Sequence, residues 1–98
     1  MDNDIFYNPE DPSIFYKNYN TKYYISNPKL SKYEKTQVLY ERVNLINNGA
    51  KVFIKHPETY KSVIDIAEAE LQERKIPFII KRQVGTNYEY WKLSDLIL

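Results

Sequence analysis

Pro77 constrains the fold of this chain more than any other residue, because it separates two different hydrophobic patterns. Before it, Ile64, Ala67 and Leu71 recur at helical spacing, whereas residues 78–80 are aromatic or β-branched. Proline cannot continue a helix, and it disfavours helical backbone at the residue before it. The sequence therefore predicts a helix that ends before Pro77 and a strand that begins directly after it.

Capping residues predict where two helices begin and end. Ser31 and Glu34 have the spacing of a capping box, so a first helix should begin near Ser31 and end at Gly49, which can adopt a left-handed conformation. Ser62 is a suitable N-cap for the second helix. Helical spacing predicts the apolar face of the first helix, namely Thr36, Leu39, Val43 and Ile46, flanked by Val38 and Leu45.

The remaining segments have strand character. Residues 51–54 read as a short extended piece and residues 78–82 as a strand; Gly85 marks a turn, and residues 88–93 return. Alternation in the return strand predicts one face with Tyr88 and Tyr90, and another with Glu89, Trp91 and Leu93. The predicted fold class is α+β, a small single domain over residues 31–98 with two main helices, a short strand and a C-terminal β-hairpin.

Residues 1–30 differ from the rest of the chain. Pro9, Pro12 and Pro28 interrupt any helix, and the first fifteen residues contain four acidic residues and no basic one. The segment is nevertheless too aromatic for an ordinary disordered tail. We therefore expect an extended N-terminal arm that can dock on another protein through its rings, which are Phe6, Tyr7, Phe15, Tyr16, Tyr19, Tyr23 and Tyr24.

Composition limits the classes of function. The formal net charge of +1 argues against strong electrostatic binding to nucleic acid. The absence of cysteine and the presence of only two glycines argue against a thiol nucleophile and a glycine-rich phosphate loop. His56 is the only histidine, with Glu58 alone nearby, and reads as a loop residue. Without a long apolar run or a signal peptide, we expect a soluble, intracellular protein that needs no cofactor.

Two clusters of charge leave alternatives open. The acidic cluster could suggest paired carboxylates, but at helical spacing it is more simply the solvated face of the second helix: Asp65, Glu68 and Glu73. The basic cluster is interleaved with aromatic residues and could bind a single-stranded nucleic acid, although half-exposed hairpins often look like this: Lys81, Arg82, Lys92, Tyr88 and Tyr90.

Two stretches together resemble a known family. The first is residues 31–34, Ser-Lys-Tyr-Glu, which lead into the helix that carries Arg42. The second is residues 64–82, with a helix ending Glu-Leu-x-x-Arg-Lys-Ile-Pro and an apolar strand with two basic residues at its end, before the Trp-bearing residues 88–91. Over roughly residues 28–98 the chain resembles the omega-type subunits of multisubunit DNA-directed RNA polymerases. These are the sixth common subunit of eukaryotic nuclear polymerases, archaeal subunit K and bacterial omega.

Three features depart from the eukaryotic members. Ser62-Val63 stands where they usually have Asp-Pro, and the turn at residues 84–87 lacks their Pro-Asp-Gly. The arm, residues 1–30, is less acidic and richer in tyrosine than their long tails. A short version rich in Tyr, Asn and Lys resembles those of large cytoplasmic DNA viruses, which implies a viral factory or virion as its location, and otherwise the nucleus.

The resemblance implies a non-catalytic subunit that clamps and stabilises the largest polymerase subunit and promotes assembly with the other subunits. It implies no active-site residue, no metal and no cofactor, and contact with DNA or RNA only through the complex. The alternatives are a free-standing single-stranded nucleic-acid-binding module and, less favoured, a small enzyme. Arg42 could instead form an ion pair with Glu41 or Glu34. The residues that the resemblance favours for gripping the largest subunit are Tyr33, Glu34, Arg42, Arg74, Lys75, Arg82 and Trp91.

Overall fold

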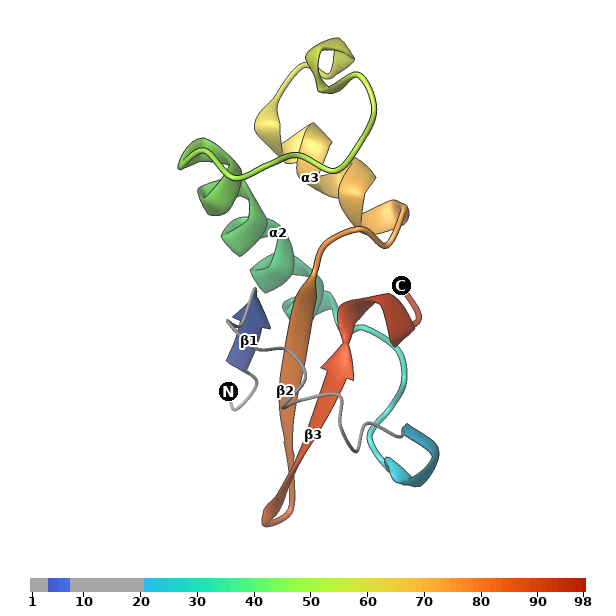
Figure 1. The fold of residues 1–98 in the computed structure, drawn as a ribbon. Helices are drawn as coiled ribbons and strands as arrows, with labels where there is room; N and C mark the ends of the chain where they lie inside the picture. The colour runs from blue at the N-terminus through green and yellow to red at the C-terminus, as the bar shows by residue number, and fades with distance from the viewer. Residues whose placement is uncertain (1–3, 8–20) are drawn as a thin grey trace. The chain divides into compact units, whose positions relative to one another are not determined.

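The computed structural model describes residues 4–7 and 21–98, which form two helices and an antiparallel sheet (Figure 1). The α+β class is therefore confirmed. The chain divides into two compact units. The helical unit is Ser31–Ile76 with Leu98, and the sheet unit joins the described residues up to Leu30 with Pro77–Ile97. The elements in order are β1 (Asp4–Tyr7), η1 (Thr21–Tyr23), α2 (Lys32–Asn47), η2 (Pro57–Thr59), α3 (Val63–Gln72), β2 (Phe78–Val84), β3 (Asn87–Lys92) and η3 (Leu93–Asp95).

Both helices begin at the predicted caps. The Ser31 hydroxyl accepts the Glu34 N–H, and the Glu34 carboxylate accepts the Ser31 N–H, each at 3.0 Å, so the capping box is complete. At the start of α3 the Ser62 hydroxyl accepts the Asp65 N–H at 3.3 Å. Gly49, with φ +95°, follows the end of α2 in the left-handed region, as predicted.

The buried face of α2 differs from the predicted apolar face. The buried residues are Glu34, Val38 and Arg42, spaced four apart, whereas Thr36 is exposed and Leu39 is only half-buried. The prediction holds for Val38, but it placed Thr36 and Leu39 at the centre of the face because it ranked residues by hydropathy, whereas two charged side chains are buried here with partners inside the chain. On α3 the prediction is confirmed for Ala67 and Leu71, which are buried, but not for Ile64, which is 44% exposed.

Residues 51–54 form no strand, so the predicted short strand was wrong. Their backbone groups bind side chains instead of a neighbouring strand. The Lys51 carbonyl accepts a hydrogen bond from Arg42, and the Phe53 N–H donates to Glu70, both at 2.8 Å. The segment is therefore an irregular connection fixed by two buried charged residues, and Ile54 within it is buried.

The sheet unit contains the predicted hairpin and one strand that was not predicted. β2 pairs antiparallel with β3 through a turn at Gly85, which has φ +62°. β1 pairs antiparallel with the other edge of β2, so part of the N-terminal arm is a strand. Glu89 and Trp91 share the buried face of β3, as predicted, while Leu93 lies in η3 beyond the strand.

The residues around Pro77 form part of the core: Leu71, Ile76, Phe78 and Ile80 are each at most 3% exposed. Pro77 itself is exposed and directly precedes β2, in agreement with the predicted change from helix to strand. Among the helices of the described part of the chain, none has the length and apolar character that a membrane span requires.

Candidate partner interface

A buried ion pair holds the helical unit together. The Arg42 guanidinium on α2 donates from Nε to one carboxylate oxygen of Glu70 on α3 at 2.6 Å, and from a terminal nitrogen to the other at 2.8 Å. Arg42 is 1% exposed and Glu70 is fully buried. This two-pronged geometry matches a planar guanidinium to a planar carboxylate and gives the strongest type of ion pair.

The same pair fixes the connection between the helices. The second terminal-nitrogen bond of Arg42 goes to the Lys51 carbonyl, and Glu70 also accepts the Phe53 N–H. The Arg42 guanidinium lies 5.2 Å from the centre of the Phe53 ring, within the range of a cation–π contact. In the described part of the chain no buried side-chain nitrogen or oxygen atom lacks a hydrogen-bond partner, and Phe53, 40% exposed, is held at the surface.

A second network lies in the sheet unit and holds residues 21–30, which we call the strap. Arg82 on β2 donates to the Ser26 hydroxyl at 3.2 Å, to the Asn27 carbonyl, and to the Lys29 carbonyl at 3.1 Å. Arg82 is 7% exposed. Its guanidinium therefore supplies hydrogen-bond donors to two backbone carbonyls of an irregular segment.

Glu89 on β3 binds the same part of the strap. Its carboxylate accepts the Ile25 N–H at 2.8 Å, the Ser26 N–H at 3.3 Å and the Ser26 hydroxyl at 2.6 Å, and the Trp91 indole N–H lies 3.4 Å away. Burial acts to raise the pKa of Glu89, but these hydrogen bonds to Ser26, Ile25 and Trp91 outweigh it and lower the pKa below its ordinary value of 4.5. The carboxylate is therefore held ionised.

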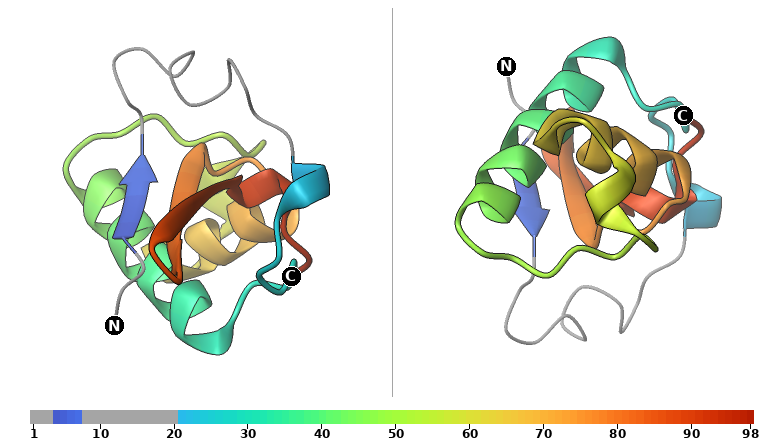
Figure 2. Two further views of the ribbon diagram at one scale, coloured as in Figure 1. Left: turned by 90° about the horizontal axis from the view of Figure 1, so that it is seen from below. Right: turned by 90° about the horizontal axis from the view of Figure 1, so that it is seen from above.

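Tyr24 and Trp91 complete the inner side of the strap. The Tyr24 hydroxyl donates to the Tyr90 carbonyl at 3.2 Å and accepts the Tyr90 N–H at 3.4 Å. The Tyr24 ring meets Trp91 edge-on at 5.1 Å, and the Trp91 indole N–H donates to the Ser26 hydroxyl at 3.1 Å. Figure 2 shows the strap running beside β3 and the C-terminal turn, where Lys29 and Ile97 form a parallel bridge.

Comparison with known proteins decides the family. The chain is 34% identical over 79 residues to the "Probable DNA-directed RNA polymerases I, II, and III subunit RPABC2" of Caenorhabditis elegans, covering 80% of this chain and 57% of that protein. It is 36% identical over 70 residues to the "DNA-directed RNA polymerases II and V subunit 6B" of Arabidopsis thaliana, covering 70% of this chain and 48% of that protein. It is 35% identical over 72 residues to the Saccharomyces cerevisiae RPABC2 subunit, covering 72% of this chain and 46% of that protein.

The chain belongs to the RPABC2 family of omega-type polymerase subunits. This confirms the resemblance found in the sequence. The chain spans about half the length of the curated relatives that it matches. No family model matches the chain.

The structure separates the predicted site residues of this RPABC2 relative into two groups. Three of them have exposed side chains: Tyr33, Arg74 and Lys75, of which Lys75 forms a surface ion pair with Glu73 at 3.1 Å. Four of them are buried and bonded within their own unit: Glu34, Arg42, Arg82 and Trp91. The alternative that Arg42 forms an ion pair with Glu41 or Glu34 names the wrong partner, since the structure pairs Arg42 with Glu70.

The basic cluster predicted on the hairpin is divided between two faces. The Lys81 ammonium lies 4.7 Å from the centre of the Tyr88 ring, whereas Arg82, the next residue along β2, is buried on the opposite face. The nucleic-acid alternative needs these cations on one surface and is not favoured. His56 is exposed and lies 3.5 Å from Glu58, as expected of a loop residue.

Three residues that organise these networks were not predicted: Glu70, Glu89 as a binder of the strap, and Ser26. The signal for Glu70 was its position three residues after Ala67 and next to Leu71, which places a carboxylate on the apolar side of a helix. No comparable local pattern marks Ser26, because its partners lie 56 to 65 residues further along the chain.

Proposed function

We propose that this chain is a non-catalytic subunit of a DNA-directed RNA polymerase, that it clamps and stabilises the largest subunit, and that it promotes assembly of the enzyme. The observation that carries the proposal is the identity of about 34–36% to RPABC2 and subunit 6B proteins, whose names describe subunits shared among RNA polymerases. A chain that binds only the folded form of a large partner stabilises that form by mass action.

The wider assignments follow from the same proposal. The partners are the largest subunit and other polymerase subunits, with DNA and RNA met only through the complex. Relatives that serve eukaryotic polymerases I, II and III support a nuclear location. Since the three relatives come from cellular organisms, the resemblance to viral versions stays a prediction.

The geometry supports two different roles for the predicted site residues, direct contact with a partner and stabilisation of this chain's own surfaces. Tyr33, 45% exposed, stands at the start of α2, while Arg74 and Lys75 follow the end of α3 with exposed side chains. Tyrosine and arginine are frequent anchors of protein interfaces. We assign direct contact with the largest subunit to these exposed residues. The buried ones, Glu34, Arg42, Arg82 and Trp91, contribute by fixing the surfaces of their own units.

Arg74 has a backbone that strengthens this assignment. It occupies the left-handed region at φ +59°, in the position after the C-cap of α3 that glycine usually takes. Its N–H binds the Leu71 carbonyl and the Lys75 N–H binds the Glu70 carbonyl, each at 3.0 Å, which together form a Schellman motif. An arginine held there against its conformational preference is consistent with a use for its side chain.

The test is subunit stoichiometry followed by catalytic rate. The variants Tyr33→Ala and Lys75→Ala should lower the amount of this chain in polymerase purified from its native source. Matched controls are Tyr88→Ala, with 49% exposure close to that of Tyr33, and Lys55→Ala on an exposed connection. Polymerase that retains the subunit should extend RNA at a near-normal rate, since the subunit contributes no group to the transition state.

Two outcomes would contradict the proposal. Normal stoichiometry with a collapsed elongation rate would mean that one of these residues works at or near the active centre. Failure of the wild-type chain to co-purify with any polymerase subunit would remove the proposal altogether. Substituting Arg42 or Trp91 is less informative, because both are buried and their loss also destabilises the chain itself.

A further inference from the structure

The strap presents two different sides. Its inner side is fixed by Arg82, Glu89 and Trp91, which converge on Ser26 through donor–acceptor distances of 3.2, 2.6 and 3.1 Å. Tyr24, on the same side, binds the backbone of Tyr90. Residues 24–27 are therefore held to the sheet by side-chain hydrogen bonds, and residues 28–30 by backbone hydrogen bonds to Ile97, so the path of the strap is set by contacts over most of its length.

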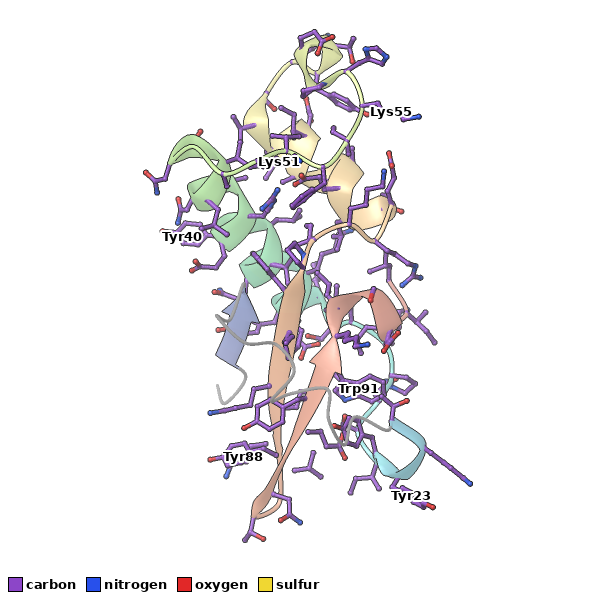
Figure 3. The ribbon with its side chains drawn as sticks, in the orientation of Figure 1. Tyr23, Tyr40, Lys51, Lys55, Tyr88 and Trp91 are labelled. Atoms are coloured by element: carbon purple, nitrogen blue, oxygen red, sulfur yellow. The ribbon has the colours of Figure 1, made fainter. Side chains whose placement is uncertain are left out.

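The outer side carries two large apolar side chains. Tyr23 is 75% exposed and Ile25 is 78% exposed, the two highest values among the large hydrophobic residues in the described ranges. They alternate with Tyr24 and Ser26, whose side chains bind residues of β2 and β3, so the exposed and the bound side chains lie on different sides of the strap. Figure 3 shows Trp91 directed toward the strap and Tyr23 directed away from it. Two adjacent exposed apolar side chains of this size offer contact area that a partner can cover.

The charge on the strap indicates the chemistry of what binds there. Residues 21–30 contain Lys22 and Lys29 and no acidic residue, and both lysines are exposed. The Lys22 ammonium lies 5.7 Å from the centre of the Tyr23 ring, next to one of the anchors. The carboxylate bonded to the strap, that of Glu89, is buried and committed to Ser26 and Ile25. Within residues 21–30 the outer side therefore carries apolar side chains and two lysines.

We propose that the outer side of the strap binds an acidic segment of a second protein, with apolar side chains of that segment covering Tyr23 and Ile25 and its carboxylates facing Lys22 and Lys29. The proposal is independent of the polymerase assignment, since it rests only on the sheet unit. Because Glu89 and Arg82 fix the strap before any partner arrives, the partner does not have to order it. A fixed surface formed by two adjacent side chains is narrow, and it suits a peptide segment better than a broad globular face.

The first experiment identifies what lies against Tyr23 in the native complex. The photoreactive amino acid benzoylphenylalanine replaces Tyr23 in the full chain, the complex is irradiated in its native source, and the crosslinked peptide is sequenced. The same amino acid at Tyr88, an exposed tyrosine on β3, provides the control. The expected product is a crosslink specific to position 23, to a protein segment that contains both acidic and apolar residues.

The second experiment measures the recovered peptide, made synthetically, against the purified full chain by fluorescence anisotropy. Tyr23→Ser and Ile25→Ser should each weaken binding about tenfold or more, which corresponds to about 1.4 kcal/mol, because each removes one of the two anchors on which the proposal rests. Ser26→Ala does not alter the outer side but loosens the strap, and it should weaken binding about three- to tenfold. Lys22→Gln and Lys29→Gln should reduce the salt dependence of binding. Circular dichroism confirms that each variant is folded.

Several outcomes would overturn the proposal. A crosslink to nucleic acid, to lipid, to a second copy of the chain or to its own residues 1–20 would assign the strap to another occupant. The proposal would also be wrong if no crosslink were specific to position 23, or if the crosslinked segment contained no acidic residue. Unchanged affinity in the folded Tyr23→Ser and Ile25→Ser variants would show that the crosslinked segment only passes near the strap.

Discussion

Removing one partner of the Arg42–Glu70 pair should destabilise the chain severely. The pair is buried, and Glu70 also holds the Phe53 N–H while Arg42 holds the Lys51 carbonyl. Glu70→Leu leaves the guanidinium charge buried without its counter-ion, and Arg42→Met does the same to the carboxylate. Breaking a buried pair from one side typically costs about 3–5 kcal/mol. A chain of this size has a total stability of about 5–15 kcal/mol, so each single variant should be near the limit of folding.

The double variant separates charge burial from simple loss of contacts. Arg42→Met with Glu70→Leu replaces both charges by apolar groups, so no uncompensated charge remains, and the cost should fall well below the sum of the single costs. Because the hydrogen bonds to Lys51 and Phe53 are also lost, the double variant should still be about 1–3 kcal/mol less stable than the wild type. The expected coupling energy is therefore several kcal/mol.

Equilibrium urea unfolding of the full chain, followed by Trp91 fluorescence and circular dichroism, measures the four variants of this cycle. A fixed concentration of a stabilising osmolyte keeps the single variants folded at zero urea. The control is Lys75→Ala, which breaks the half-exposed Lys75–Glu73 ion pair and should change stability by less than about 1 kcal/mol. Single costs below 1 kcal/mol, or a double variant whose cost equals their sum, would refute the reasoning.

Four further predictions concern other positions. Ser31→Ala should cost about 0.5–2 kcal/mol, measured by urea unfolding, because it removes one half of the capping box. Leu71→Ala should cost about 2–5 kcal/mol in the same assay, since Leu71 is 1% exposed. The pKa of Glu89 is lower in the folded than in the unfolded chain, so its contribution to stability is complete above pH 4.5 and is lost as pH falls through the folded pKa. In the Glu89→Gln variant the unfolding free energy, measured at a series of pH values, should therefore fall less steeply as the pH is lowered through this range. Arg74→Gly should raise the unfolding free energy by up to about 1 kcal/mol by relieving the left-handed backbone, and yet lower incorporation into polymerase, whereas a loss of stability would contradict the strain argument.

Local chemistry made most of the fold predictable. Ser31 with Glu34, and Ser62, satisfy the first N–H groups of their helices through side chains three residues apart, so the signal lies within a few residues. Pro77 acts on the residue before it, and Gly85 acts within its own turn. Each of these elements could be placed without knowledge of the tertiary structure. The strand β1 could not, because its partner β2 lies more than 70 residues away in the sequence.

The candidate site was predictable only in part, for a related reason. A resemblance to omega-type subunits selected Arg42, Arg82 and Trp91, and all three are centres of hydrogen-bonding networks. The direction of their bonds was not predictable, because hydropathy treats a charged residue as a surface residue unless its partner is known. Glu70 is 28 residues from Arg42, and Ser26 is 56 residues from Arg82, so neither partner shares a local pattern with its arginine.

The two units use their buried charges in the same way. In each, an acid and an arginine that lie on regular elements bind the backbone of an irregular segment: Glu70 and Arg42 bind residues 51–53, and Glu89 and Arg82 bind residues 25–29. An irregular segment cannot satisfy its own N–H and C=O groups, and in a chain this small there is little apolar core to cover them. Arginine and carboxylate side chains supply several donors or acceptors from one position, so one residue can fix several backbone groups. Each network thereby holds exposed apolar side chains at the surface, Phe53 in one unit and Ile25 in the other, which is where a partner protein can reach them.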